Sequence, residues 1–386
     1  MRYFIKNSGN KENEPENSDK TIIFSCSFIK YYFPFYAKKL VNSINSEIID
    51  NTFNILCNKS QESFTAVINE RLYMDVKSSD SFLGKDFYPF LVNIYNPESF
   101  IKNTSFRKYR SLWGLKRSVS DFKTFSKRTD IFLKENFDST LDKIKSELSD
   151  LLLLSIKTSS YFSFLINSLP ENIFTQNDFS HEDLIYVIEN DREVKNFNFE
   201  SNMMKLNILY SYLPDQDKRN FYRFNTDEFI SSGTIMSEPL KNFMEKFGFM
   251  NSAKDFSENI FYEDYKNMKS EVINYKKNNR SLFQNPDYKK FSSGIPLSSG
   301  TIKKLIFIRT FREKTDYLFY NYYFLLRKVF INYGNLLVNE NIIDSPEDIF
   351  YCGIKELKNI NREMISENKK NYLSAKNTDS EESIYK

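Results

Sequence analysis

The stretch from residue 302 to residue 338 constrains the fold of this 386-residue chain more than any other part of the sequence. No proline interrupts the chain between Ile302 and Asp344, and apolar residues recur three, four or seven positions apart, as on one face of a helix. This apolar stripe consists of Leu318, Tyr322, Leu325, Leu326, Val329, Tyr333, Leu336 and Leu337. We expect a helix of roughly 55 Å with the stripe in the core, bent or weakened at Gly334.

Helices are expected in most of the remaining chain as well. Nine glycines and ten prolines are too few for an all-β fold with many tight turns. A second helix is predicted after Ser139 and Asp142, which resemble a capping box. Residues 64–76 are rich in β-forming residues on both sides of Asn69 and Glu70, which predicts a hairpin. The expected fold class is mainly α, a large helical domain with one small β-hairpin near the N-terminus.

The polar ends of the chain set the expected domain boundaries. We expect a flexible lead-in over residues 1–20, one helical domain over residues 21–375 and a flexible tail over residues 376–386. The most apolar stretch is interrupted by Asp150 and Lys157, so it predicts a buried helix and not a membrane span. With 40% hydrophobic and 27% charged residues, the composition is typical of a soluble globular protein.

Cysteine and histidine usage limits the chemistry that is expected. The three cysteines form neither a CxxC pair nor a disulfide framework, which predicts a reducing, cytoplasmic location. Because His181 is the only histidine, a metal site with several histidines is excluded. We expect His181 itself at the surface, in the first turn of a helix. We therefore predict no metal site. Phosphate-binding glycine loops are absent as well, so no nucleotide site of that kind is expected in this chain.

Positive charge is concentrated between Arg107 and Arg128, which hold eight lysines and arginines against one acid, Asp121. This basic segment could face phosphate groups or nucleic acid, and a solvated helix face is the simpler interpretation. The net charge of +3 for the whole chain does not by itself indicate nucleic acid. Nucleic-acid binding is therefore the weakest of the hypotheses considered.

Four stretches resemble, in order, one family of enzymes, the phosphoenolpyruvate-synthase-like proteins and in particular the rifampicin phosphotransferases. "FSCSFIKYYFPFYAKKL" (24–40) resembles the start of the helical region of that family, and "AVINERLYMDV" (66–76) resembles its NGRLYxN hairpin. "LKNFMEKFGFMNSAKDFSENIFYED" (240–264) resembles its FLxxYGHRGxxExDLxxPxWxED segment. Residues 307–357, which end in "SPEDIFYCGIKEL", resemble its long arginine-bearing helix and the turn that follows.

The resemblance covers only the middle part of such an enzyme, the helical substrate-binding domain. It implies that an ATP-grasp domain and a swivelling domain with a phosphate-carrying histidine would be supplied by separate proteins. It also implies that ATP and magnesium bind to a partner, with no cofactor in this chain. The turn that begins at Ser345 would then be the place where such an enzyme leads on to its swivelling domain.

The chain departs from the family pattern at polar positions. Phe249 and Met250 stand where the family has a histidine and an arginine. Neither side chain can act as an acid or a base, or donate a hydrogen bond to an anion. Activation of an acceptor hydroxyl would therefore need Lys254, Asp255 or Glu258. No catalytic residue is assigned from the sequence, and whether the chain is an enzyme stays open.

The expected substrate site combines the resembling segments. Its candidate residues are Tyr73, Phe247, Phe249, Met250, Lys254, Asp255, Arg309 and Arg312. Because Phe249 and Met250 are apolar, we expect a small, largely apolar ligand, with Lys254, Arg309 and Arg312 supplying charge at the rim. The alternative for Arg309 is an ordinary surface ion pair with Glu313, four residues away.

Two hypotheses for function stay open at this stage. In the first, the chain is the stand-alone substrate-binding component of a split phosphotransferase and acts with ATP-grasp and phosphohistidine proteins. In the second, it is a degenerate, non-catalytic helical domain that binds an apolar ligand or a protein partner.

Overall fold

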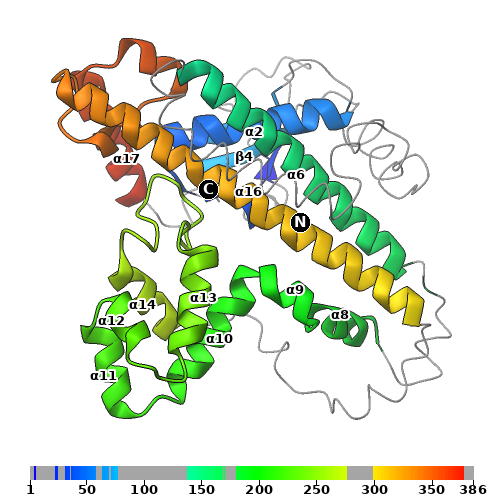
Figure 1. The fold of residues 1–386 in the computed structure, drawn as a ribbon. Helices are drawn as coiled ribbons and strands as arrows, with labels where there is room; N and C mark the ends of the chain where they lie inside the picture. The colour runs from blue at the N-terminus through cyan, green and yellow to red at the C-terminus, as the bar shows by residue number, and fades with distance from the viewer. Residues whose placement is uncertain are drawn as a thin grey trace.

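The computed structural model describes residues 4–5, 22–24, 31–34, 36–57, 63–68, 71–76, 137–167, 169, 180–275 and 299–377. Within these ranges the protein is mainly α-helical, as expected (Figure 1). The helices are α2 (Lys39–Cys57), α6 (Phe137–Asn167), α8 (His181–Glu189), α9 (Arg192–Phe197), α10 (Phe199–Ser211), α11 (Asp215–Arg223), α12 (Thr226–Ser231), α13 (Ser237–Phe247), α14 (Tyr265–Asn274), α16 (Ser299–Asn339), α17 (Arg362–Asn377) and the 3₁₀ helices η4 (Pro346–Tyr351) and η5 (Ile354–Asn359).

Four short strands pair in the order β1-β2-β4-β3, each antiparallel to its neighbour. They are β1 (Phe4–Ile5), β2 (Ile22–Phe24), β3 (Thr65–Ile68) and β4 (Arg71–Val76). Strands β3 and β4 occupy the segment for which the sequence predicts a hairpin, in a register that pairs Ile68 with Arg71. Helix α2 contacts both strands. Strand β1 falls inside the segment expected to be a flexible lead-in.

Helix α16 is the central element, and it confirms the helix predicted for residues 302–338. It runs over 41 residues, or about 60 Å at 1.5 Å per residue, and packs along α6 (Figure 1). The two helices are antiparallel, because Phe137 at the start of α6 stacks on Tyr333, whereas Ile166 near its end lies in one apolar cluster with Leu305. The predicted stripe is buried at Leu318, Tyr322, Leu325, Leu326, Val329 and Leu337.

The prediction was wrong for Leu336, whose side chain is 51% exposed. Leu336 lies almost one turn beyond Tyr333, where α6 begins with Phe137. Helical spacing gives the face on which a residue lies, but it does not show where the neighbouring helix ends. The periodicity of the stripe could therefore not reveal this exposed position.

Helices α8 and α9 pack along the N-terminal half of α16, and α10 to α14 lie together below α16 in this view (Figure 1). Aromatic side chains fill this core. The largest fully buried side chains of the described residues are all phenylalanine or tyrosine. Among them, the ring centroid of Phe243 lies 5.5 Å from that of Phe247 and 6.0 Å from that of Phe261. The high phenylalanine content is therefore used mainly in packing.

The "SPEDIFYCGIKEL" segment folds back on the helical domain. Ser345 caps η4, since its Oγ accepts from the backbone N–H of Glu347 while the Asp348 carboxylate accepts from the N–H of Ser345. The helix that follows Ser345 is a 3₁₀ helix of six residues. Ile349 and Phe350 are fully buried, and η4 packs against α16, α2 and α17. In this structure the turn runs on through η5 into α17.

Gly334 has a packing role that the sequence did not show. A Cβ atom at this position would lie 2.9 Å from the Cα of Pro346 and closer still to the Pro346 carbonyl oxygen. Only glycine lets the backbone of η4 approach α16 this closely. The helix continues through Gly334, so the expected bend or weak point is replaced by a close contact between two backbones.

We expect Gly334→Ala to lower the free energy of unfolding by about 1–3 kcal/mol, because the new methyl group must displace backbone atoms. In an open helical position the same change would raise stability by up to about 1 kcal/mol. The sign of the change therefore distinguishes a close backbone contact from an open position. Urea unfolding of both proteins measures it. An unchanged or raised stability would show that η4 does not press on Gly334.

Candidate functional site

A cavity of about 330 Å³ lies beneath α16, between this helix, α9, the start of α10 and the turn after α13. Its lining is mixed, with aromatic rings such as Phe197 and Tyr317 beside charged side chains. The charged residues are Lys254, Arg309, Arg312, Glu189, Glu200, Glu313 and Asp316. The volume is at the lower end of the range of small-molecule sites.

Five of the eight candidate residues from the sequence line this one cavity. They are Phe247, Met250, Lys254, Arg309 and Arg312. The turn that follows α13 and the N-terminal half of α16, which are about 60 residues apart in the sequence, are thereby brought together. This juxtaposition is what a shared ligand site between the two segments would require.

The other three candidate residues do not line the cavity. Phe249 points elsewhere and packs on Tyr317 and Phe324, with ring centroids 5.9 and 6.2 Å apart. Asp255 is 3% exposed and lies outside the lining. The backbone of Tyr73 lies in β4, and its side chain falls outside the described part of the structure. The expected apolar contribution of Phe249 is therefore missing from the cavity.

Arg309 is a buried cation with donors left over. Its Nη2 lies 2.8 Å from Glu313 Oε1 and 3.4 Å from Glu189 Oε1, and its side chain is 9% exposed. Because Glu313 is 2% exposed, this pair is buried, which excludes the surface ion pair considered from the sequence. Among the described residues, neither Nε nor Nη1 of Arg309 has a hydrogen-bond partner. A guanidinium buried with two unpaired nitrogens is costly unless a ligand accepts from it.

Arg312 is held by a carboxylate that is itself saturated. Its Nε lies 3.6 Å from Asp316 Oδ2, and its guanidinium stands 5.3 Å from the ring centroid of Tyr31. Asp316 also accepts hydrogen bonds from the hydroxyl groups of Tyr31, Tyr32 and Ser155. With both of its oxygens engaged, Asp316 positions Arg312 and has little capacity left to accept a hydrogen bond from a ligand.

Lys254 is the one polar candidate of the 249–258 segment that reaches the cavity. Its Nζ donates to the Tyr31 carbonyl oxygen at 2.5 Å and lies 4.5 Å from the centroid of the Tyr31 ring. Burial lowers the pKa of Lys254, against the opposing effect of nearby carboxylates. Its φ of 55° is in the left-handed region, which is unusual for a non-glycine residue. Glu258, by contrast, pairs with Lys38 at 2.8 Å.

The cations were expected at the rim of an apolar pocket, and the structure places them differently. Arg309 is buried, and Arg312 and Lys254 are mostly buried within the lining. The burial of Glu313 raises its pKa, although Arg309 opposes this. The difference arises because the buried acids of α16, one turn after each arginine, hold the guanidinium groups inside.

No protein-family model matches the chain, and no curated protein is detectably similar to it in sequence.

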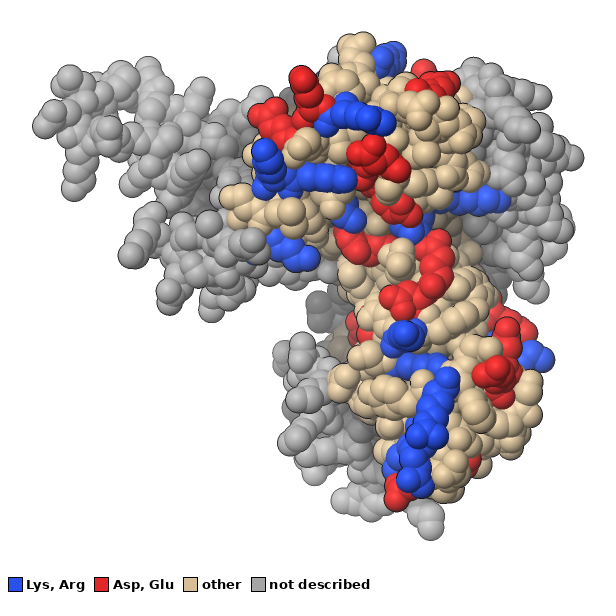
Figure 2. Space-filling model, turned by 90° about the vertical axis from the view of Figure 1, so that its left-hand side faces the viewer, with Lys and Arg blue, Asp and Glu red and all other residues tan. Residues whose placement is uncertain are grey.

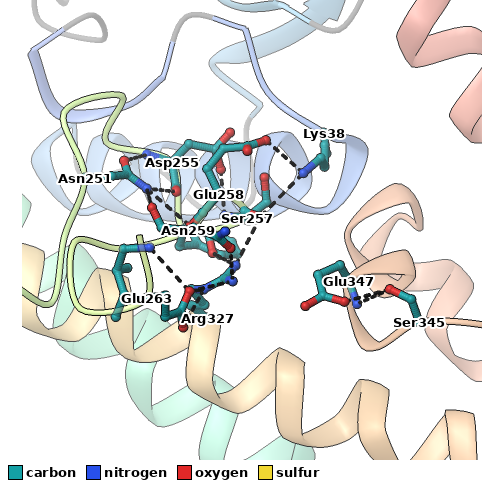
Figure 3. Close-up of polar contacts among 12 residues, drawn as sticks. Lys38, Asn251, Asp255, Ser257, Glu258, Asn259, Glu263, Arg327, Ser345 and Glu347 are labelled. Carbon is teal, nitrogen blue, oxygen red and sulfur yellow. Dashed lines mark hydrogen bonds and ion pairs between the residues drawn. The ribbon is translucent and has the colours of Figure 1, made fainter. Parts of the chain in front are cut away.

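Arg327 holds the turn that carries Lys254, and sequence reasoning missed it (Figure 3). From α16, its Nε donates to the Glu263 carboxylate at 2.9 Å, its Nη1 to the Ser257 carbonyl at 3.1 Å and its Nη2 to Asn259 Oδ1 at 2.9 Å. The side chain of Arg327 is 5% exposed. The signal was present as Arg327 and Lys328, which stand between Leu326 and Val329 in the apolar stripe. A charge at such a position indicates a buried polar partner when its side chain faces the core.

Other candidates contribute nothing described to this site. The basic segment from Arg107 to Arg128 lies outside the described residues, and so does the side chain of His181. In the described ranges no group of three His, Cys, Asp or Glu residues could hold a metal ion. A search of the same ranges finds no helix long and apolar enough to cross a membrane.

The face drawn in Figure 2 carries positive and negative side chains in alternation over its upper part. Ion pairs between elements also occur in the described part of the chain, such as Lys39 with Glu356 at 2.5 Å and Lys369 with Asp348 at 2.5 Å. A nucleic-acid surface presents a more continuous positive patch than this. The described part of this upper face therefore gives no support to the nucleic-acid hypothesis.

Stability is expected to rise as the pH falls from 7 to 5. Burial raises the pKa of Asp255 to about 6, against a hydrogen bond from Ser257, and burial raises that of Glu271 to about 7. The folded state therefore binds protons that the unfolded state has released at these pH values, so unfolding is favoured as the pH rises. For Asp255 alone the change between pH 7 and pH 5 is about 1 kcal/mol.

The measurement is urea unfolding at both pH values. Asp255→Asn keeps an acceptor for the Ser257 N–H and should reduce the rise, whereas Asp344→Asn, whose side chain is 78% exposed, should not. A pH dependence that is the same in the wild type and in Asp255→Asn would contradict the prediction.

Proposed function

We propose that the chain is the substrate-binding component of a split phosphotransferase. Such an enzyme would be related to the phosphoenolpyruvate-synthase-like proteins and in particular the rifampicin phosphotransferases, which stretches of this chain resemble. The observation that supports this most is the meeting of Phe247, Met250, Lys254, Arg309 and Arg312 in one cavity. All five come from segments for which the resemblance implies a substrate site. ATP and magnesium would act on an ATP-grasp partner, and a swivelling phosphohistidine partner would carry the phosphate.

The lining holds three cations and four carboxylates, so the proposed class of ligand depends on which donors of the cavity are unpaired and not on its net charge. The two unpaired nitrogens of Arg309 favour an acceptor, such as a carboxylate or phosphate oxygen, because a bound anion would restore their hydrogen bonds. The rings of Phe247, Phe197 and Tyr317 offer apolar surface beside it. We therefore propose a small ligand with an apolar or aromatic body and one anionic group, in place of the largely apolar molecule expected from the sequence.

Lys254 is the proposed group for activating an acceptor hydroxyl. It lines the cavity, and its lowered pKa makes the neutral amine more accessible, which a general base requires. Asp255 is buried outside the lining, and Glu258 is engaged with Lys38. We keep the cytoplasm as the proposed location, since the sequence has no disulfide framework.

A non-catalytic binding domain is the second candidate function. The observation that favours it is the replacement of the family's histidine and arginine by Phe249 and Met250, combined with the turning of Phe249 away from the cavity. In that case the cavity would bind its ligand without any transfer of phosphate. The two candidates share the site and differ only in turnover.

Reconstitution with labelled ATP separates the two candidates. The chain alone is expected to acquire no acid-labile phosphate from ATP, whereas in the presence of an ATP-grasp protein and a phosphohistidine protein the label should pass to a small molecule. Lys254→Met should slow this transfer while leaving ligand affinity within about threefold. Absence of transfer with an active, phosphorylated partner pair would rule out the phosphotransferase and leave the binding domain.

A further inference from the structure

A second hollow, here called the basic groove, lies between α9, α10 and α13 and has a volume of about 720 Å³. One acid, Glu238, lines it together with four cations. The cations are Arg192, Lys195, Lys205 and Lys246. The groove adjoins the cavity described above at Ser201, which lines both. It is nevertheless a distinct place on the protein, since its cations come from α9, α10 and α13 and none of them lines the cavity.

None of the four cations has a carboxylate within ion-pairing distance in the described part of the chain. Glu238, the acid of the groove, instead accepts a hydrogen bond from Asn242 at 3.0 Å. Lys246 donates to the neutral side chain of Asn196. The groove therefore gathers four positive charges against one carboxylate, which pairs with none of them in the described part of the chain.

This arrangement has an energetic cost that an anion would offset. Burial lowers the pKa of Lys195, and burial together with the positive charge of Lys205 lowers the pKa of Lys246. The amines of Lys195 and Lys246 are thus partly removed from water, and Lys205 repels Lys246. A phosphate group carries up to two negative charges and three acceptor oxygens, so it could be shared by neighbouring amines in such a groove.

Part of the lining of the groove is apolar, which indicates more than a free inorganic anion. This part, here called the floor, consists of Leu206, Ile208, Leu209 and Pro239, and the side chain of Ile208 is 37% exposed. The volume falls within the range of small-molecule sites, which is roughly 300–1,000 Å³. Apolar ligand surface placed on this floor would be removed from water.

We infer that the basic groove binds a small organic phosphate, with the phosphate between Lys205 and Lys246 and the organic part on the floor formed by Ile208 and Leu209. The inference goes beyond the function proposed above and does not depend on it. The cavity would hold its own ligand, and the groove would hold a second, phosphorylated one.

The test is isothermal titration calorimetry on the full chain with three probes. Phenyl phosphate should bind several-fold more tightly than inorganic phosphate, and phenol should not bind measurably. Lys205→Gln/Lys246→Gln should weaken phenyl phosphate binding by about tenfold or more, since it removes two charge-assisted contacts. The matched control, Lys241→Gln, changes an exposed lysine of α13 that does not line the groove, and it should keep the wild-type affinity.

Four results would overturn the inference. Phenyl phosphate could fail to bind, or bind equally to the wild type and the Lys205→Gln/Lys246→Gln variant. Its binding could instead be lost in Arg309→Gln/Glu313→Gln, which would place the phosphate in the cavity. A glutamate-rich peptide that displaces phenyl phosphate at lower concentration than inorganic phosphate would identify the groove as a protein-docking surface. Circular dichroism of each variant confirms that it is folded before titration.

Discussion

Leu326→Ala is expected to lower the free energy of unfolding by about 2–5 kcal/mol, the largest effect of any single apolar truncation proposed here. Leu326 is fully buried in the middle of α16, where this helix packs along α6. Removing three carbon atoms loses the transfer free energy of the side chain and leaves a cavity that rigid neighbours only partly fill. The effect therefore measures directly how far the stripe on α16 contributes to the core.

Leu336→Ala is the matched control, because it makes the same chemical change ten residues along the same helix. Its side chain is 51% exposed, so we expect a change of at most about 0.5 kcal/mol. Urea unfolding of the three proteins gives both values. Equal losses for the two variants would contradict the packing of α16 described here.

Arg327→Met is expected to lower the free energy of unfolding by about 3 kcal/mol. The change keeps most of the volume of the side chain but removes every contact to Glu263, Asn259 and the carbonyl group of Ser257 (Figure 3). Breaking a buried pair costs about 3–5 kcal/mol when the remaining charge is inaccessible to water. Glu263 is 42% exposed, so the lower end of that range applies.

Arg362→Met provides the comparison for this charge. Arg362 pairs with Asp344 at 3.3 Å, and both side chains are more than half exposed, so the loss should stay below about 1 kcal/mol. In addition, Arg327→Met should loosen the turn that carries Lys254. Faster hydrogen exchange at residues 251–263 would report this, and unchanged exchange would show that Arg327 does not hold the turn.

The long helices could be predicted from the sequence because their signals are local. The stripe on α16 follows helical spacing, and α6 shows the same spacing, with Leu141, Ile144 and Leu148 all buried. The 3₁₀ form of η4 could not be predicted, since its cap and its proline also suit an α-helix. It is fixed by the close contact of Pro346 with Gly334, which is a tertiary feature.

The candidate site was predicted in part, for an equally physical reason. The resemblance predicted that residues 240–264 and 307–357 contribute to one site, and these segments do meet. It could not show which side chains of an irregular turn point into the cavity. Phe249 therefore turned out to face Tyr317, while Lys254 reached the cavity. The basic groove left no trace in the sequence, because Arg192, Lys205 and Lys246 are spread over three helices.

In the function proposed above, the cavity recognises an anionic group through Arg309. The most direct measurement compares the affinity of 1-naphthoate with that of its neutral amide, for the wild type and for Arg309→Gln/Glu313→Gln. This double variant replaces the buried ion pair by two neutral amides, so only Glu189, whose side chain is 30% exposed, loses its cation. We predict that the wild type binds the carboxylate at least about tenfold more tightly than the amide and that the double variant shows no preference. Equal affinities in the wild type, or a preference for the carboxylate that survives in the double variant, would contradict recognition of an anionic group by Arg309.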